Sequence, residues 1–396
     1  MSRKAWFILT GFKRLFDSRP VHAQLVLTYE CNLSCGYCHE FTHGAPVTPY
    51  EVIVRRIDAL ASLGAIAYDL LGGEPLLHPR IVDIVRRVKA TNRGVNFVTL
   101  ITNAFKLTPE LIDGLNDAGL DCMQVSVDTI DPTVALPKSL RSVLPKLALL
   151  AERAQFQVKI QTVLTDESWR HYPQFRELLA PFDFEFSFSL LHDEHGRVAI
   201  QGTRFAEILE QHELFPGLKF FRRHAKEMML GNPTRPWKCL GGFKYLYVKP
   251  DGTTQYCSQV PGLRIPVEQL TLADLRRANV HKPCEPGCAL GCVRTVSHAM
   301  GSPLSTLSTS IEILRDYMRR RSTAAPSASG SVDERQPHPS RRSQAKGPPQ
   351  GERKFSLDNN NATARPEEPP SFGGVSKGAR SSESRSPDPA GRRAVS

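Results

Sequence analysis

Three cysteines in one short segment are the clearest chemical signal in this sequence of 396 residues. Cys31, Cys35 and Cys38 have the spacing CxxxCxxC. Cysteine thiolates hold iron–sulfur clusters, and three thiolates on one loop can bind a cubane and leave one iron open. A structural zinc site needs four ligands, so a zinc interpretation must recruit His39 or His43. A disulfide interpretation leaves one thiol over and requires an oxidising compartment.

A second group of cysteines lies further along the chain. It consists of Cys239, Cys257, Cys284, Cys288 and Cys292. Five thiols exceed the four that one closed cubane needs and fall short of the eight that two would need. We therefore predict one site in this group, which takes four of the five thiols. Four thiolates around zinc are the alternative, because spacing does not separate zinc from cluster iron.

Repeated βα units are predicted to position the first cysteine group. Short apolar runs alternate with amphipathic segments from residue 22 to about 191, which is typical of a parallel sheet. The predicted strands are residues 23–28, 66–71, 97–101, 123–127, 156–163 and 184–191. Six such units fit a partial (β/α)6 TIM-like barrel, whose functional residues gather where the strands end.

Helix signals support this assignment. Thr48, Pro49 and Glu51 fit a capping box with proline at the first helical position, and Thr108 and Pro109 fit a similar helix start. In the C-terminal part, the Pro-Asp-Gly turn that ends at Gly252 predicts a hairpin, which would bring Cys239 and Cys257 together.

The CxxxCxxC loop, with Tyr37 before its third cysteine, resembles the radical S-adenosylmethionine (SAM) superfamily over roughly residues 22–191. The resemblance implies that Cys31, Cys35 and Cys38 bind a [4Fe-4S] cluster whose open iron is chelated by SAM. It further implies reductive cleavage of SAM to methionine and a 5′-deoxyadenosyl radical, which abstracts hydrogen from a substrate.

The same resemblance extends to residues that follow the second, third and fourth strands. Gly72, Gly73 and Glu74 resemble the family's GGE motif, in which glycine permits close backbone approach and Glu74 would accept the ammonium group of SAM. The other candidate SAM-binding residues are Tyr37, Thr102, Asn103, Ser126 and Asp128. Capping and turn formation are the alternative roles for such polar side chains. The fifth strand lacks the Gly-rich or Asn-containing sequence frequent in the family, so adenosine contacts there stay unassigned.

The order Cys239, Gly252, Cys257 resembles the opening of the SPASM and twitch extensions, which hold auxiliary [4Fe-4S] clusters. The resemblance implies one auxiliary site that uses Cys239, Cys257 and two of the last three cysteines, with Cys288 beside either Cys284 or Cys292. We predict an N-terminal amphipathic segment (1–20), the radical SAM core (21–195), a helical connection (196–236), a small Cys-rich auxiliary domain (237–300) and a C-terminal helix (301–320). Residues 321–396, rich in Ser, Pro, Gly and Arg, are predicted to be a disordered basic tail.

Composition and charge exclude several classes of protein. Hydrophobic residues make up 40% of the chain, and no apolar run is long enough for a membrane span. The net charge is +11, of which +6 falls on residues 1–320, so nucleic acid is not an expected partner. The nine cysteines, with no secretory signal, indicate the cytoplasm. Residues 3–17 form a basic amphipathic segment that we expect to pack on the barrel, with a membrane surface as the alternative.

The leading functional hypothesis is a radical SAM oxidoreductase or maturase that acts on a peptide or a small molecule and takes electrons from a donor such as flavodoxin or ferredoxin. A second hypothesis is an enzyme similar to the molybdenum-cofactor GTP cyclase, although that family has three C-terminal cysteines and a Gly-Gly end. A third is a non-catalytic iron–sulfur or zinc scaffold. Residues that finish turnover are unknown; Glu185, His192, His195 and Tyr256 are candidates by location only.

Overall fold

The computed structural model describes residues 3–38, 41–193, 195–200, 202–211, 219–232, 236–309 and 311. Contacts divide the chain into the units Met1–Ser327 and Ala328–Ser396, and every described residue belongs to the first. Three predicted features lie wholly or partly outside the described residues: the tail (321–396), His39, and the part of the predicted C-terminal helix beyond residue 309 except residue 311.

One mixed sheet organises the first unit. Its strands are β1 (His22–Val26), β2 (Ala67–Leu71), β3 (Phe97–Thr102), β4 (Cys122–Ser126), β5 (Gln157–Leu164), β6 (Glu185–Leu190), β7 (Tyr245–Val248) and β8 (Thr254–Gln255). The order in the sheet is β6-β5-β4-β3-β2-β1-β7-β8, and β8 alone pairs antiparallel among these strands. The six predicted strands are confirmed to within two residues at each end, and the parallel α/β fold agrees with a partial barrel.

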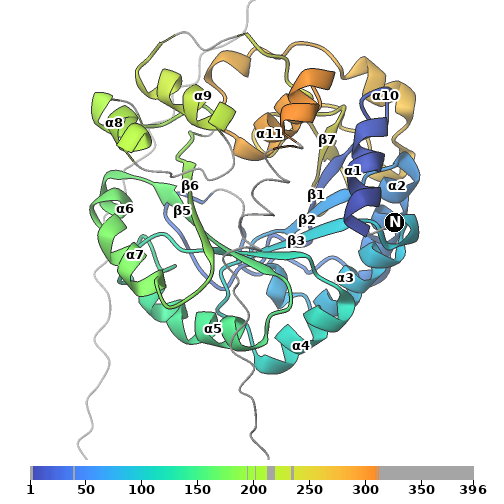
Figure 1. Ribbon diagram of the computed structural model, residues 1–396. Coiled ribbons are helices and arrows are strands. Elements are labelled where there is room, and N and C mark those ends of the chain that lie inside the picture. Colours follow the sequence, from blue (N-terminus) through green and yellow to red (C-terminus); the bar gives the residue numbers. More distant parts are fainter. Residues whose placement is uncertain are drawn as a thin grey trace, which may run out of the picture. The chain divides into compact units, whose positions relative to one another are not determined.

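The described helices are α1 (Arg3–Lys13), α2 (Tyr50–Leu63), α3 (Ile81–Ala90), α4 (Pro109–Ala118), α5 (Leu140–Arg153), α6 (Asp166–Arg170), α7 (Tyr172–Leu179), α8 (Thr203–Gln211), α9 (Lys219–Met229), α10 (Leu272–Arg277) and α11 (Gly291–Ala299). The helices labelled α2 to α7 lie along the outer face of the sheet, whereas α8, α9 and α11 lie at the top of the view (Figure 1). Short 3₁₀ turns are η1 (Pro75–Leu77), η2 (Asn92–Gly94), η3 (Val267–Gln269) and η4 (Glu285–Gly287). None of the helices in the described part of the chain is long and apolar enough to cross a membrane.

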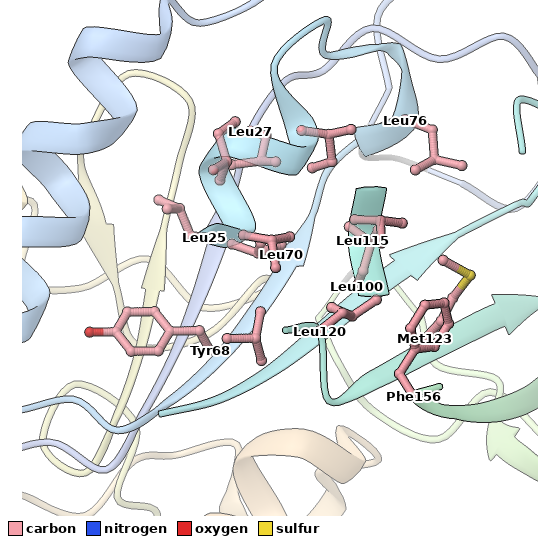
Figure 2. Packing of buried hydrophobic residues seen from close by; sticks show 14 of the residues in the cluster. Leu25, Leu27, Tyr68, Leu70, Leu76, Leu100, Leu115, Leu120, Met123 and Phe156 are labelled. Atoms are coloured by element: carbon pink, nitrogen blue, oxygen red, sulfur yellow. The ribbon is translucent and has the colours of Figure 1, made fainter. Parts of the chain in front are cut away.

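Side chains along each strand alternate between the two faces of the sheet, and the two faces differ in polarity. Leu25, Leu70, Leu100 and Met123 point toward the helices and join one buried apolar cluster with residues such as Leu115 (Figure 2). Burial of such side chains contributes roughly 1.5–3 kcal/mol each, which makes this cluster the main stabilising element. The opposite face carries the polar residues of the same strands, and the candidate functional residues gather at its carboxyl end.

One predicted helix start is wrong and another is confirmed. Thr48 does not cap α2: the N-cap is Pro49, without a side-chain hydrogen bond, and the Thr48 hydroxyl lies 3.4 Å from the Pro250 carbonyl. A tertiary partner therefore replaces the local one. At α4, Thr108 accepts a hydrogen bond from the Leu111 amide, with Pro109 at the first helical position.

The segment that carries Cys239 and Cys257 is continuous with the core sheet. β7 lies beside β1 in parallel register, with Tyr245 opposite His22, and the β7–β8 hairpin extends the sheet beyond it. The hairpin forms around the predicted turn, in which Gly252 has a φ of +88° that favours glycine. The Arg56 guanidinium on α2 donates to the Pro250 carbonyl at 2.7 Å, which holds the turn against the core.

The N-terminal segment packs against the sheet unit, as expected. The Phe7 ring lies 6.1 Å from the Phe97 ring, and Arg14 Nε donates to the Gly64 carbonyl at 3.2 Å. The exposed apolar side chains of this segment are Trp6, Leu9, Phe12 and Phe16.

Candidate metal centres and cofactor site

The first three cysteines lie on the loop that follows β1. Cys31 and Cys35 are buried and Cys38 is half-buried. Within the loop, the Cys38 amide donates to the Cys35 carbonyl at 3.0 Å. The loop thus presents three thiols at the carboxyl end of the central strands, where barrel folds place functional groups.

The Gly-Gly-Glu segment after β2 fixes the start of this loop through its backbone. The Gly73 amide donates to the Thr28 carbonyl and the Glu74 amide to the Glu30 carbonyl, both at 2.8 Å. A Cβ atom on Gly72 would lie 2.4 Å from the Thr28 oxygen, and one on Gly73 would lie 2.2 Å from the Glu30 oxygen. Both glycines are therefore required for close contact between two backbone segments.

The Glu74 side chain is fully buried and bonded to the protein itself. Oε1 accepts from the Leu76 amide at 2.9 Å and from the Thr102 hydroxyl at 2.7 Å, and Oε2 accepts from the Asn103 amide at 2.7 Å. Burial raises the pKa of Glu74, although these hydrogen bonds oppose the shift. A carboxylate offers about four acceptor positions, and the protein itself fills three of them at Glu74.

The ends of the third and fourth strands are connected to the cysteine loop in different ways. Asn103 Nδ2 donates to Asn32 Oδ1 at 2.9 Å, so its side chain contacts the loop directly. The Thr102 hydroxyl donates to Glu74, whose amide binds the start of the loop, and Ser126 is half-buried at the end of β4. Asn32 was not among the predicted site residues, since it bears no signal beyond its place between two cysteines.

Tyr37 and Asp128 meet a residue that the sequence did not single out. The Tyr37 hydroxyl donates to Asp128 Oδ2 at 2.8 Å, and Lys138 Nζ lies 2.6 Å from the Tyr37 hydroxyl and 3.1 Å from Asp128 Oδ2. Burial would lower the pKa of Lys138, but Asp128 and Tyr37 more than offset it and raise that pKa above its usual value. Lys138 therefore stays charged beside the loop. No spacing pattern in the sequence links Lys138 to Tyr37, which lies about 100 positions earlier in the chain.

The thiols of the first loop are in a desolvating environment. Burial raises the pKa of Cys31, and burial raises the pKa of Cys35 to about 11 against the opposing effect of Lys138. A metal or cluster binds the thiolate, so its binding would release these protons. Three thiols on one loop, two of them buried, are a donor set that fits iron–sulfur chemistry.

The structure gathers four of the five C-terminal cysteines around one pocket. The cysteines that line it are Cys239, Cys257, Cys284 and Cys288. Cys292 is not part of this lining; its sulfur lies 3.4 Å from the Tyr245 hydroxyl. Of the two pairings left open by the sequence, the geometry favours Cys288 with Cys284.

The surroundings of this pocket suit sulfur ligands. The Gly241 amide donates to Cys239 Sγ and the Val260 amide to Cys257 Sγ, each at 3.3 Å. Lys282 and Arg294 are buried cations whose charges interact with Cys239. Burial raises the pKa of Cys257 to about 12. Among the described residues, however, no three His, Cys, Asp or Glu side chains converge on a single metal ion.

The four candidates for proton transfer are dispersed. Glu185 pairs with Lys159 at 3.3 Å, and His192 Nδ1 lies 3.0 Å from the Asp193 carbonyl oxygen. His195 and Tyr256 line the second cysteine pocket. The roles of these four side chains stay predictions.

Comparisons with known proteins give a family match for part of the core sheet. Residues 25–179 match the radical SAM superfamily. The chain is 32% identical over 164 residues to the GTP 3′,8-cyclase of Lactiplantibacillus plantarum, covering 39% of this chain and 47% of that protein. It is 37% identical over 134 residues to the GTP 3′,8-cyclase of Chlorobaculum tepidum, covering 33% and 38% respectively. The chain therefore spans less than half the length of these relatives.

A solved structure shares the fold at low sequence identity. Streptococcus suis SuiB bound to its precursor peptide SuiA has a TM-score of 0.50 and 14% identity, and the match covers 69% of this chain and 68% of that one.

Proposed function

We propose that this chain is an enzyme that cleaves SAM reductively and abstracts hydrogen from a substrate, because residues 25–179 match the radical SAM superfamily. The observation that carries the proposal is the buried three-cysteine loop held at the carboxyl end of β1 by the Gly-Gly-Glu segment.

Cys31, Cys35 and Cys38 would hold the [4Fe-4S] cluster. When bound, that cluster supplies the electron that splits SAM into methionine and a 5′-deoxyadenosyl radical. The protein's own part is to orient SAM and to exclude water. We assign these tasks to residues on the cysteine loop or at the carboxyl ends of the neighbouring strands, namely Tyr37, Gly72, Gly73, Glu74, Thr102, Asn103, Ser126 and Asp128.

We propose a second [4Fe-4S] cluster in a SPASM-like or twitch-like region that corresponds to residues 237–300. The ligands would be Cys239, Cys257, Cys284 and Cys288, because these four line one pocket. The amide donors on two of the sulfurs and the two nearby cations support thiolate ligands there. We further propose that the radical SAM core spans residues 21–195 and that a helical connection spans residues 196–236.

For the substrate we propose a peptide or small molecule, and a nucleotide is the second candidate. The curated relatives named GTP 3′,8-cyclase favour GTP, whereas the fold shared with SuiB favours a peptide. Incubation of reduced protein and SAM with GTP, followed by mass spectrometry of the nucleotide, separates the two. Conversion of GTP supports the cyclase candidate, and SAM cleavage without nucleotide conversion favours the other.

We further propose a cytoplasmic location and a flavodoxin or ferredoxin as electron donor, since nine free thiols fit a reducing compartment. The exposed apolar side chains of the N-terminal segment mark where a membrane surface would touch the protein. Co-sedimentation with anionic vesicles, compared with Phe16→Ser, tests that contact.

The experiment for the main proposal uses protein reconstituted anaerobically with iron and sulfide. Reduced protein is expected to convert SAM to 5′-deoxyadenosine, and Cys35→Ala is expected to lose this activity while keeping the auxiliary absorbance. Cys122→Ala is the matched control, because Cys122 is buried in β4 away from both cysteine groups. Full cleavage by Cys35→Ala would overturn the assignment. Iron uptake without any cleavage would favour the scaffold hypothesis.

A further inference from the structure

A largely buried ion pair contacts Tyr37 of the first cysteine loop. Lys138 Nζ lies 3.1 Å from Asp128 Oδ2, and the two side chains are 15% and 4% exposed. The Tyr37 hydroxyl bridges them, at 2.8 Å from the carboxylate and 2.6 Å from the ammonium. A buried ion pair is costly to desolvate and gives little net stability, so its presence here points to another role.

The segment that carries Lys138 is docked on the cysteine loop. The Gly36 amide, between two of the cysteines, donates to the Ala135 carbonyl at 2.8 Å. At the other end of the segment, the Asp128 amide donates to the Lys138 carbonyl at 2.8 Å. The Tyr37 hydroxyl therefore contacts two charged side chains, Asp128 and Lys138, that flank a segment bonded to the cysteine loop.

The two charges act on the first cysteine group in opposite directions. The Tyr37 hydroxyl contacts both charges, and Tyr37 stands directly before Cys38 in the chain, so both charges lie beside the cysteine loop. Reduction adds one negative charge to an iron–sulfur cluster, and nearby charges and hydrogen bonds set its potential. A positive charge nearby therefore favours the reduced state.

We propose that the Asp128–Lys138 ion pair, bridged by Tyr37, sets the reduction potential of the cluster held by Cys31, Cys35 and Cys38. This inference rests on the proposed function. Lys138 raises the potential and Asp128 lowers it, so the pair keeps the cluster reducible without fixing it in the reduced state.

The test is a redox titration of the reconstituted full chain, followed by electron paramagnetic resonance. The signal that changes when SAM is added identifies the cluster of the first loop and separates it from the auxiliary one. Lys138→Gln is expected to shift the midpoint to lower potential and Asp128→Asn to shift it to higher potential. The double variant is expected to lie between them, close to the unmodified protein.

Matched variants separate charge from structure. Lys138→Arg keeps the positive charge and is expected to keep the potential. Lys89→Gln removes the cation of another buried ion pair, with Asp121, beyond the opposite ends of the strands, and is expected to leave the potential unchanged. A merely structural role for Lys138 would not make the two neutral variants shift the midpoint in opposite directions.

Shifts in the same direction, or no shift in either neutral variant, would overturn the inference while leaving SAM cleavage intact. Loss of the cluster in both neutral variants, with retention in Lys138→Arg, would overturn it in favour of a purely structural ion pair. Absence of any SAM-sensitive signal in the unmodified protein would instead defeat the proposed function.

Discussion

The Thr102 hydroxyl donates a 2.7 Å hydrogen bond to Glu74 Oε1, and both residues are almost completely buried. This contact joins the end of β3 to the segment that follows β2. Since the Glu74 amide also binds the Glu30 carbonyl, one residue connects two strand ends with the cysteine loop.

We expect Glu74→Ala to lower the free energy of unfolding by roughly 3 kcal/mol, because it strands three buried hydrogen-bond donors. Urea unfolding of the apoprotein measures the change. Glu152→Ala, at a carboxylate whose side chain is 68% exposed, serves as the control and should alter stability by less than about 0.5 kcal/mol. Equal stability of Glu74→Ala and the unmodified protein would contradict this role.

Alanine substitutions at two glycines near the first cysteine loop are expected to have different effects on stability and iron binding. Gly73→Ala would drive a methyl group into the Glu30 carbonyl, which we expect to cost roughly 2 kcal/mol and to displace the cysteine loop. Gly36→Ala would place its methyl group 3.5 Å from the Ala135 oxygen, an ordinary contact. Iron bound per protein after reconstitution should fall in the first variant and persist in the second. Equal iron content in both would refute the steric argument.

The C-terminal cysteines give a test of ligand identity. Cys257→Ala is expected to reduce bound iron toward that of one cluster, because Cys257 lines the shared pocket. Cys292→Ala is expected to keep the full iron content, because Cys292 contacts Tyr245 instead. Iron and sulfide analysis of anaerobic samples measures both. The reverse pattern would assign Cys292 to the auxiliary site.

His78 should make stability depend on pH. Its Nδ1 accepts from the Arg80 amide and its Nε2 lies 3.0 Å from the Thr48 carbonyl oxygen, an arrangement that requires the neutral ring. Burial lowers the pKa of His78, and the charge of Arg80 adds to the shift.

The unfolded chain therefore binds a proton at His78 more readily than the folded protein does. The stability due to the neutral ring is fully present above the unfolded pKa of about 6.5 and is lost as the pH falls through the folded pKa. Unfolding free energies at two pH values, about 7.5 and 5.5, should differ more for the unmodified protein than for His78→Gln. The same dependence in both proteins would assign it to other groups.

The sequence by itself determined the six core strands, the Thr108 helix cap, the Pro-Asp-Gly hairpin and both cysteine groups. These features depend on residues close together in the chain, whose apolar alternation, capping and turn preferences act locally. The placement of Cys31, Cys35 and Cys38 after a strand was predictable for the same reason.

Only the tertiary structure decided which distant groups meet. Thr48 lies near Pro250 rather than capping its own helix. Lys138 reaches Tyr37 across about 100 residues. Cys284 and Cys292 have the same spacing from Cys288, yet only Cys284 shares its pocket. A buried polar group must form a hydrogen bond with a partner that the fold brings within reach. The residues next to it in the sequence do not determine which partner that is.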